Sequence, residues 1–214
     1  MKGRGRRLKG FAKISIPLVA GILLLSSCIE VTEKITMNAD GSGVVALSYQ
    51  VARVVQDLPP QTGANPVIPL PADPTRLQAA IQGAPGLTLT SFNPVETSQS
   101  VGADITVRFD TIDDLDQAVG ALSASSLTLL NTSGLATFTQ TLYPGNPKGV
   151  SAETLRLVKE LFANYRLSFT LQAPRPIQTV NIGTISSDKS TATYTTAVPD
   201  IIQSTTPVVW EVTW

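Results

Sequence analysis

The sequence of 214 residues contains no histidine and a single cysteine, Cys28. Without histidine the chain cannot form a Ser-His-Asp or Cys-His catalytic arrangement, and it lacks both the usual general base near neutral pH and the imidazole ligand of zinc sites. A single cysteine cannot form a disulfide bond within the chain. These absences exclude the common nucleophilic hydrolases and the histidine-ligated metalloenzymes.

Charged residues make up only 15% of the sequence and aromatic residues only 6%. Six of the 16 basic residues and none of the 16 acidic residues lie in residues 1–27, so residues 28–214 carry 10 basic and 16 acidic side chains, a net charge of −6. An acidic body favours neither nucleic acid nor electrostatic adhesion to an anionic membrane. We therefore expect no nucleic-acid partner.

The N-terminus has the pattern of a signal peptide. Residues 1–13 contain basic side chains and no acid, and residues 14–25 form an apolar run interrupted by one Ser and one Pro. This run is too short for a stable transmembrane helix, which needs about 20 apolar residues. Arg6-Arg7 suggests a twin-arginine leader, but Lys9 stands where that pattern has an apolar residue, so we interpret the pair as part of the basic region.

The leader ends in Leu25-Ser26-Ser27-Cys28, which resembles the lipobox of bacterial lipoproteins. The resemblance implies cleavage between Ser27 and Cys28 and acylation of Cys28, with palmitate expected among the chains. Two or three chains, at ~0.8 kcal/mol per buried methylene, anchor a protein stably to a membrane. The implied location is the bacterial cell envelope, and Ile29 in place of Asp favours the outer membrane if the organism has one. The alternatives are an uncleaved anchor or a small buried thiol.

Residues 28–214 predict one α+β domain, with one or more antiparallel β-sheets and two to three helices packed on one face. Alternating apolar side chains predict strands over 29–37, 44–51, 87–92, 103–109, 127–130, 135–141, 167–171, 179–185, 191–196 and 208–214. A turn is expected at 38–43 and a connection at 94–102. Capping residues Asp73, Thr111 and Ser151 predict helices over 75–82, 111–122 and 152–165, and one helical turn is expected near 201–202.

The layout of the chain also resembles a known family. The hairpin around NADGSG follows the anchor directly, and the later segments LSFTLQAP, TATYTTAV and VVWEVTW complete a pattern similar to the LppM-like family of bacterial envelope lipoproteins. The similarity covers residues 29–50 and 166–214. It implies an α/β domain linked to recognition of envelope lipids, and it supplies no catalytic motif. Members of that family usually end in a membrane helix, whereas this sequence ends in a predicted strand.

Two groups of oxygen-bearing side chains can be compared with calcium sites. The densest acidic cluster stands at Asp110, Asp113, Asp114 and Asp116. Its spacing is not that of a known calcium loop, and acids in the first turn of a helix are stabilised by the helix dipole. The second group, Asn38-x-Asp40-x-Ser42, begins like an EF-hand, but the position of the bidentate acid falls on Tyr49. We therefore predict no metal site and no cofactor.

Glu153 and Glu160 lie two turns apart on a predicted helix. Paired carboxylates can hydrolyse glycosides across a cleft, but two turns span about 10.5 Å along one helix, so a solvated helix face is the simpler interpretation. Several aromatic residues could line an apolar pocket, although their spacing fits the core better: Tyr143, Phe162, Tyr165, Trp210 and Trp214. We predict no catalytic residue.

The remaining hypothesis is a non-enzymatic, lipid-anchored envelope protein that binds an apolar or lipid ligand at the membrane surface. It predicts an apolar cavity between the sheet and the helix over 152–165. An alternative is a structural or assembly partner of another envelope protein, acting through the Pro-rich segment 57–74 or a sheet edge. A hydrolase using carboxylates alone would require two acids converging in a pocket, at least one with a raised pKa.

Overall fold

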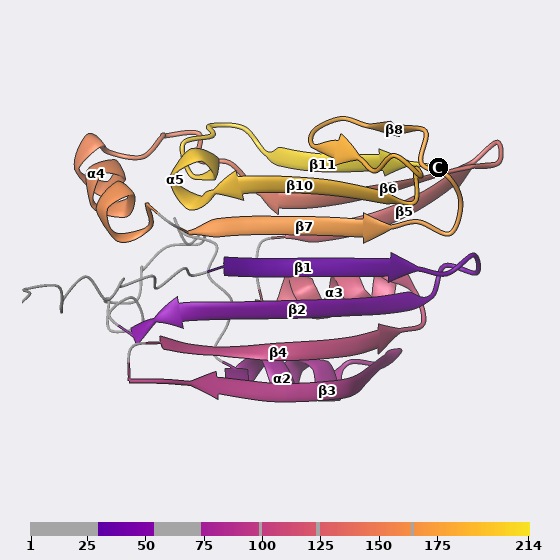
Figure 1. Ribbon diagram of the computed structural model, residues 1–214, viewed down its shortest axis with the longest axis horizontal. Helices are drawn as coiled ribbons and strands as arrows, with labels where there is room; N and C mark the ends of the chain where they lie inside the picture. The colour runs from indigo at the N-terminus through magenta and orange to yellow at the C-terminus, as the bar shows by residue number, and fades with distance from the viewer. Residues whose placement is uncertain (1–29, 54–73, 99, 123–124, 164) are drawn as a thin grey trace, which may run out of the picture.

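The computed structural model describes residues 30–53, 74–98, 100–122, 125–163 and 165–214 (Figure 1). Cys28, the leader before it, Asp73 and all of the Pro-rich segment 57–74 except Pro74 lie outside the described residues. The lipobox, the cleavage site and the acylation of Cys28 therefore stay predictions from the sequence. Within the ranges just given, no helix is both long enough and apolar enough to cross a membrane.

The described residues form an α+β fold, as predicted, and their strands lie in two sheets (Figure 1). The seven-stranded sheet has the order β3-β4-β2-β1-β7-β10-β9. Its strands are β1 (Glu30–Met37), β2 (Gly43–Ala52), β3 (Leu87–Glu96), β4 (Ser100–Phe109), β7 (Arg166–Gln172), β9 (Thr184–Ile185) and β10 (Thr191–Ala197). The four-stranded sheet, in the order β5-β6-β11-β8, contains β5 (Ser126–Thr132), β6 (Leu135–Tyr143), β8 (Thr179–Val180) and β11 (Val208–Thr213).

The helices are α2 (Pro74–Gly83), α3 (Ile112–Leu122), α4 (Ala152–Leu161) and α5 (Val198–Ile201). Helix α2 packs on β3, and α3 packs on β4 and β5, so both cover one face of the large sheet, where Figure 1 shows them behind the strands. In the same view β5 and β6 of the small sheet lie behind β7 and β10, and β8 and β11 lie above β10. We call the covered face of the large sheet the inner face and the opposite one the outer face.

Strand β1 lies in the middle of the large sheet because it pairs on both sides. It pairs with β2 in an antiparallel hairpin, in which Ile35 is opposite Val45, and with β7 in parallel, in which Glu33 is opposite Phe169. The hairpin confirms the predicted strand, turn and return strand. The parallel pair differs from the antiparallel pairing expected, because the crossover through α4 brings β7 back in the same direction as β1.

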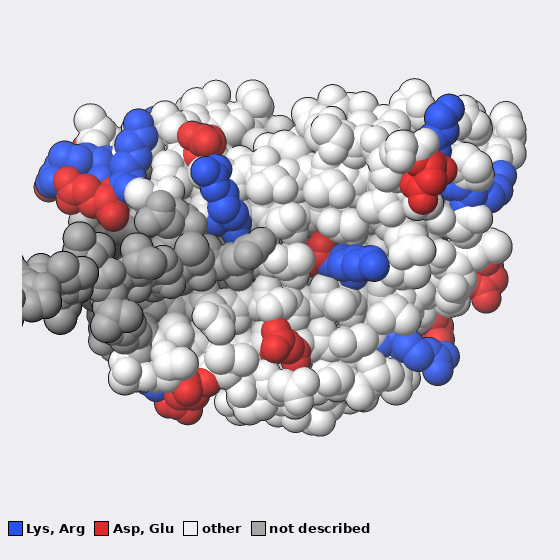
Figure 2. Space-filling view, viewed as in Figure 1, with Lys and Arg blue, Asp and Glu red and all other residues white. Residues whose placement is uncertain are grey.

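The two faces of the large sheet have opposite chemistry, as strand alternation requires. The inner face carries the core, including Ile35, Tyr49, Ile105, Phe109 and Leu171, each less than 4% exposed. The outer face carries mainly hydroxyl-bearing side chains, such as Thr32, Ser48, Thr106, Ser168, Thr170 and Thr193. Figure 2 shows this face with few charged side chains over the strands.

Helix α4 differs in length and place from the predicted helix 152–165. Ser151 caps it, as predicted, by accepting a hydrogen bond from the Thr154 amide at 3.1 Å. The helix ends at Leu161, because Phe162 leaves the helical conformation with φ −119° and is fully buried, as is most of Tyr165. Figure 1 places α4 beyond the end of the strands, so α4 does not cover the sheet face against which the sequence predicted an apolar cavity.

Two further predictions are wrong at the level of strands. The expected connection 94–102 is mostly strand, because β3 is an edge strand, where the missing N–H of Pro94 breaks no ladder bond. The single strand expected over 179–185 divides into β8 and β9, which belong to different sheets. Between them Gly183 has φ +95°, and a Cβ there would lie 2.3 Å from the Thr193 carbonyl oxygen. Only glycine fits this crossing between the sheets.

Candidate functional site

The acidic cluster belongs to the start of α3. The Thr111 hydroxyl accepts a hydrogen bond from the Asp114 amide at 3.2 Å and donates to the Asp114 carboxylate at 2.7 Å, which caps the helix. Asp116 accepts a hydrogen bond from the Leu127 amide at 2.6 Å and so fixes α3 to β5. Asp110 and Asp113 are exposed. In the described part of the chain no three His, Cys, Asp or Glu side chains are grouped so that they could hold a metal ion.

The segment Asn38-Ala39-Asp40-Gly41-Ser42 is a turn, as predicted. The Asp40 carboxylate accepts hydrogen bonds from the Ser42 amide at 3.0 Å and the Ser42 hydroxyl at 2.7 Å, and these bonds lower the pKa of Asp40. The Asn38 amide donates to the Ser42 hydroxyl at 2.9 Å. Asp40 Oδ1 and the Ser42 hydroxyl of the apparent calcium motif are thus used in closing the hairpin.

The paired glutamates of α4 face solvent. Glu153 is exposed, and Glu160 forms an ion pair with Arg156 at 2.8 Å, one turn away on the same helix. An exposed pair of this kind contributes ~0.3–0.5 kcal/mol of helix stability. The carboxyl groups therefore act on the helix surface and do not converge on a cleft.

The five aromatic residues considered for a pocket belong to the core, each 5% exposed or less: Tyr143, Phe162, Tyr165, Trp210 and Trp214. Phe162 and Tyr165 contact each other with ring centroids 4.5 Å apart. Trp210 contacts Phe138 edge to face at 6.2 Å, and its indole N–H donates to the Ile182 carbonyl at 3.1 Å. The strand predicted over 208–214 is confirmed as β11, which lies between β6 and β8 in the small sheet.

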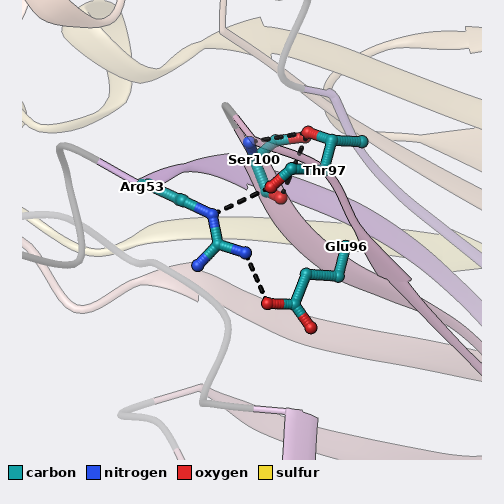
Figure 3. Close-up of polar contacts among 4 residues, drawn as sticks. All are labelled: Arg53, Glu96, Thr97 and Ser100. Carbon is teal, nitrogen blue, oxygen red and sulfur yellow. Dashed lines mark hydrogen bonds and ion pairs between the residues drawn. The ribbon is translucent and has the colours of Figure 1, made fainter.

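A polar cluster at one end of the large sheet holds β2 to the β3–β4 turn (Figure 3). The Arg53 side chain donates to the Thr97 carbonyl at 2.9 Å and forms an ion pair with Glu96. Thr97 and Ser100 close the turn through the Ser100 amide, which donates to the Thr97 hydroxyl at 2.9 Å. The ion pair is exposed and contributes ~0–1 kcal/mol, so this cluster stabilises the turn and is not a binding site.

A shallow hollow of about 460 Å³ lies beside β11 and is lined by Arg175, Pro176, Ile177, Gln178, Lys189 and Trp214. Its floor is the buried pair Ile177 and Trp214. The Arg175 guanidinium donates to the Gly134 carbonyl at 3.0 Å and to Trp214 O at 3.4 Å. Because Arg175 already joins two segments of the chain, this hollow is a weaker candidate than the interior.

The interior contains a polar pair between the two sheets. Glu33 of β1 points to the inner face, beside Leu47 of β2 and Phe169 of β7. Gln140 of β6 faces it from the small sheet, and the Gln140 amide nitrogen donates to Glu33 Oε1 at 2.8 Å. Desolvation by burial raises the pKa of Glu33, and the hydrogen bond from Gln140 opposes that shift only in part.

Gln140 is 3% exposed, and its Oε1 is buried with no hydrogen-bond partner. It lies between Trp210 on β11 and Leu127 on β5, both buried. An unpaired buried carbonyl oxygen destabilises a fold by ~1–3 kcal/mol. From the sequence alone, no role was predicted for Glu33 or Gln140. The signal was present, because Gln140 continues the buried alternation Ala136, Phe138, Leu142.

Glu33 belongs to a continuous row of inner-face residues that the covering layers leave partly exposed. The row, which we call the inner strip, consists of Val45, Leu47, Glu33 and Val31. Val45 and Leu47 are neighbours on β2, Leu47 is opposite Glu33, and Val31 follows on β1. The flanking residues Ile35 and Tyr49 are 1% and 3% exposed. The inner strip is therefore a partly exposed apolar surface that packs against the core and contains one carboxyl group.

Comparison with known proteins adds little to this geometry. No family model matches the chain, and no curated protein matches it. A similar solved structure is the NMR structure of the folded domain of LppM from Mycobacterium tuberculosis, with a TM-score of 0.47 and 10% sequence identity over 87% of this chain and 88% of that chain. It carries the name of the family that the sequence layout resembles. At this score and identity we assign neither a family nor a function from it.

Proposed function

We propose that this protein is a non-enzymatic, lipid-anchored protein of the bacterial cell envelope that binds an apolar or lipid ligand against the inner strip. The observation that carries the proposal is the partial exposure of Val31, Val45 and Leu47 on a face that two layers of structure otherwise bury. Each methylene group that a ligand buries there contributes about 0.8 kcal/mol, so a chain of several carbons would bind usefully. The predicted acyl anchor at Cys28 would hold the site near a membrane.

The polar pair supports a binding role over a catalytic one. Carboxylate hydrolysis needs two acids facing one substrate, whereas the group that faces Glu33 is the amide of Gln140. An amide neither gives nor takes a proton near neutral pH. The raised pKa of Glu33 has its cause in burial, not in a second carboxyl group.

Photo-crosslinking of the full-length processed chain in phosphatidylcholine nanodiscs tests the proposal. The probe is a dodecyl methyl ether that carries a diazirine on its chain, and labelled peptides are mapped by mass spectrometry. We expect labels on the peptides that contain Val31, Val45 and Leu47. Leu47→Trp should reduce the labelling because the larger side chain fills the inner strip. Ala46→Trp, which changes the outer face of the same strand, should not.

Labels confined to outer-face residues, or equal labelling of the Leu47→Trp and Ala46→Trp variants when both retain the β-sheet circular dichroism of the parent, would contradict the proposal. In the wild-type chain the map of labelled residues decides the question by itself. The test therefore does not depend on whether the Trp variants fold.

One observation favours a second candidate, a protein partner at the small sheet. β5 is an edge strand, and Leu130 on it is 64% exposed, while Leu135 across the hairpin is 39% exposed. Exposed leucines on a sheet edge are typical of strand addition by another chain. A Leu130→Lys variant should lose crosslinks to a neighbouring envelope protein if this candidate is correct, with binding of the apolar probe unchanged.

A further inference from the structure

The carboxyl group of Glu33 is held in one orientation. Gln140 binds Glu33 Oε1 at 2.8 Å, and Gln140 cannot turn away because it is 3% exposed between Trp210 and Leu127. Among the described residues the second oxygen, Oε2, has no hydrogen-bond partner. A side chain fixed through one oxygen, with residual accessible surface, presents the other oxygen to whatever occupies the inner strip.

The surroundings of this oxygen are apolar. The in-register neighbours of Glu33 are Leu47 on one side and Phe169 on the other, and the facing side chain is the neutral amide of Gln140. None of these groups titrates near neutral pH. A ligand that lies along the inner strip therefore meets one hydrogen-bonding group in an otherwise hydrocarbon environment.

We propose that Glu33 Oε2 recognises a single hydroxyl group on the ligand, so that the site takes an uncharged aliphatic alcohol and not an anionic or purely hydrocarbon lipid. This inference rests on the proposed function, and it adds the chemical class of the ligand. A hydroxyl group donates to the carboxylate form of Glu33 and accepts from the carboxylic acid form, so it is bound in both protonation states. An ether oxygen can only accept a hydrogen bond, so it pairs with the carboxylic acid form of Glu33 and not with the carboxylate form.

A negatively charged head group is disfavoured at the same place. Beside the carboxylate form of Glu33, a ligand carboxylate or phosphate would bring two negative charges together where their repulsion is poorly screened. In either form of Glu33, the apolar surroundings would leave the ligand's negative charge poorly solvated. Gln140 acts here as a positioning residue, because it fixes Glu33 and does not itself reach the ligand: its free oxygen is fully buried. The site therefore selects neutral over anionic ligands.

Three dodecyl photoprobes that differ only at the head group test this inference in the full-length chain in phosphatidylcholine nanodiscs: the alcohol, its methyl ether and the carboxylic acid. The readout is the probe concentration that gives half-maximal labelling of the peptide with Val45 and Leu47. At about pH 9, which favours the carboxylate form of Glu33 more than neutral pH does, we expect the alcohol to label at about three- to tenfold lower concentration than the ether. The acid should label least.

Glu33→Gln keeps the shape of the side chain and the bond from Gln140, but it presents an N–H group in place of the accepting oxygen. In this variant the alcohol and the ether should label equally, and the acid should label more strongly than in the wild-type chain. Asp104→Asn makes the same chemical change on the outer face of β4 and should leave all three probes unchanged.

Equal labelling by the alcohol and the ether in the wild-type chain at about pH 9 would overturn the assignment of Glu33 and leave the proposed function intact. A preference for the acid would overturn it too. If none of the three probes labels the inner strip, the proposed function itself fails. A dodecyl amine that labels at lower concentration than the alcohol would identify a cationic ligand and would also overturn the hydroxyl assignment.

Discussion

At the scale of single residues, Glu33 and Gln140 are a buried polar pair whose desolvation disfavours folding. Replacing two such side chains by apolar groups of similar size is often neutral or stabilising, because neither then has to be desolvated. Gln140 Oε1 remains unpaired, and Glu33 lies between Leu47 and Phe169 with a raised pKa. The two side chains therefore do not increase the stability of the fold. Their presence is consistent with the proposed role in binding a ligand.

The raised pKa of Glu33 makes stability depend on pH. In the unfolded chain Glu33 titrates with the ordinary glutamate pKa of 4.5, and in the folded protein the pKa is higher because burial disfavours the charged form. The contribution of Glu33 to the free energy of unfolding should therefore be greatest below pH 4.5 and fall as the pH rises through the folded pKa. Glu33→Gln should remove this fall, measured by urea unfolding at a series of pH values.

Asp188 supplies a control with the opposite sign. It accepts hydrogen bonds from the Ser186 hydroxyl and from the amide and hydroxyl of Ser190, which lower its pKa from 3.8 to about 2. Its stabilising effect is present above pH 3.8 and is lost as the pH falls towards 2. Asp188→Asn should lower the free energy of unfolding above pH 3.8 and remove the pH dependence between pH 3.8 and about 2. A Glu33→Gln profile that still falls above pH 4.5 would contradict the role given to burial.

At the scale of elements, the sequence predicted correctly the turns and helix starts that are closed by hydrogen bonds between neighbouring residues. The turn at Asp40, the cap of α3 at Thr111 and the cap of α4 at Ser151 are all closed by side chains within four residues of the groups they bind. The β5–β6 hairpin is similar, because Ser133 and Gly134 both take positive φ between the strands.

Features that depend on distant partners were not predicted. The end of α4 depends on Phe162 and Tyr165 finding the core, and the division of 179–185 depends on two different sheets. The pairing of Glu33 with Gln140 joins positions far apart in the sequence, so no local pattern contains it. The sequence shows two polar residues, Glu33 and Gln140, at apolar positions of predicted strands. It does not show that these two residues contact each other.

The contact between β2 and β4 gives a prediction for one element. A Cβ at Gly102 would lie 1.9 Å from the Tyr49 carbonyl oxygen, which is backbone and cannot move without separating the strands. Gly102→Ala should lower the free energy of unfolding by about 1–3 kcal/mol or more, as overpacking does. Chemical denaturation measures the change.

Gly120 in α3 is the matched control, because a Cβ there meets nothing within 4 Å and the residue is exposed. Gly120→Ala should stabilise the protein by about 0.5–1 kcal/mol, since alanine loses less conformational entropy in a helix. If the Gly102→Ala and Gly120→Ala variants had the same free energy of unfolding, β2 and β4 could not be as close at Gly102 as the structure shows.

At the scale of the whole molecule, the predicted anchor at Cys28 is close in sequence to the first strand of the large sheet. β1 begins at Glu30, so only Ile29 separates it from Cys28. Figure 1 shows β1 beginning at the end of the molecule where α4 and α5 lie. If Cys28 is acylated as its lipobox predicts, this end of the fold should face the membrane.

Acylation can be tested on the intact chain. Expressed in a bacterium, the wild-type protein should lose residues 1–27 and gain the mass of two or three acyl chains on Cys28, measured by mass spectrometry of the N-terminal peptide. Cys28→Ala should retain the leader and gain no acyl mass, because the lipobox lacks its nucleophile. A Cys28→Ala chain cleaved after Ser27 would show that another signal peptidase processes the protein.

The parallel pairing of β1 with β7 also constrains how the chain can fold. It joins residues 30–36 to residues 166–172, so β1, although made first, keeps one backbone edge unpaired until β7 has been synthesised. Contacts between residues so far apart in the sequence form slowly. Until β7 pairs with it, β1 has unpaired backbone N–H and C=O groups, to which another chain could bind. A protein delivered to its compartment from the N-terminus would need that edge shielded during the delay, and a bilayer surface or a chaperone could provide the shield.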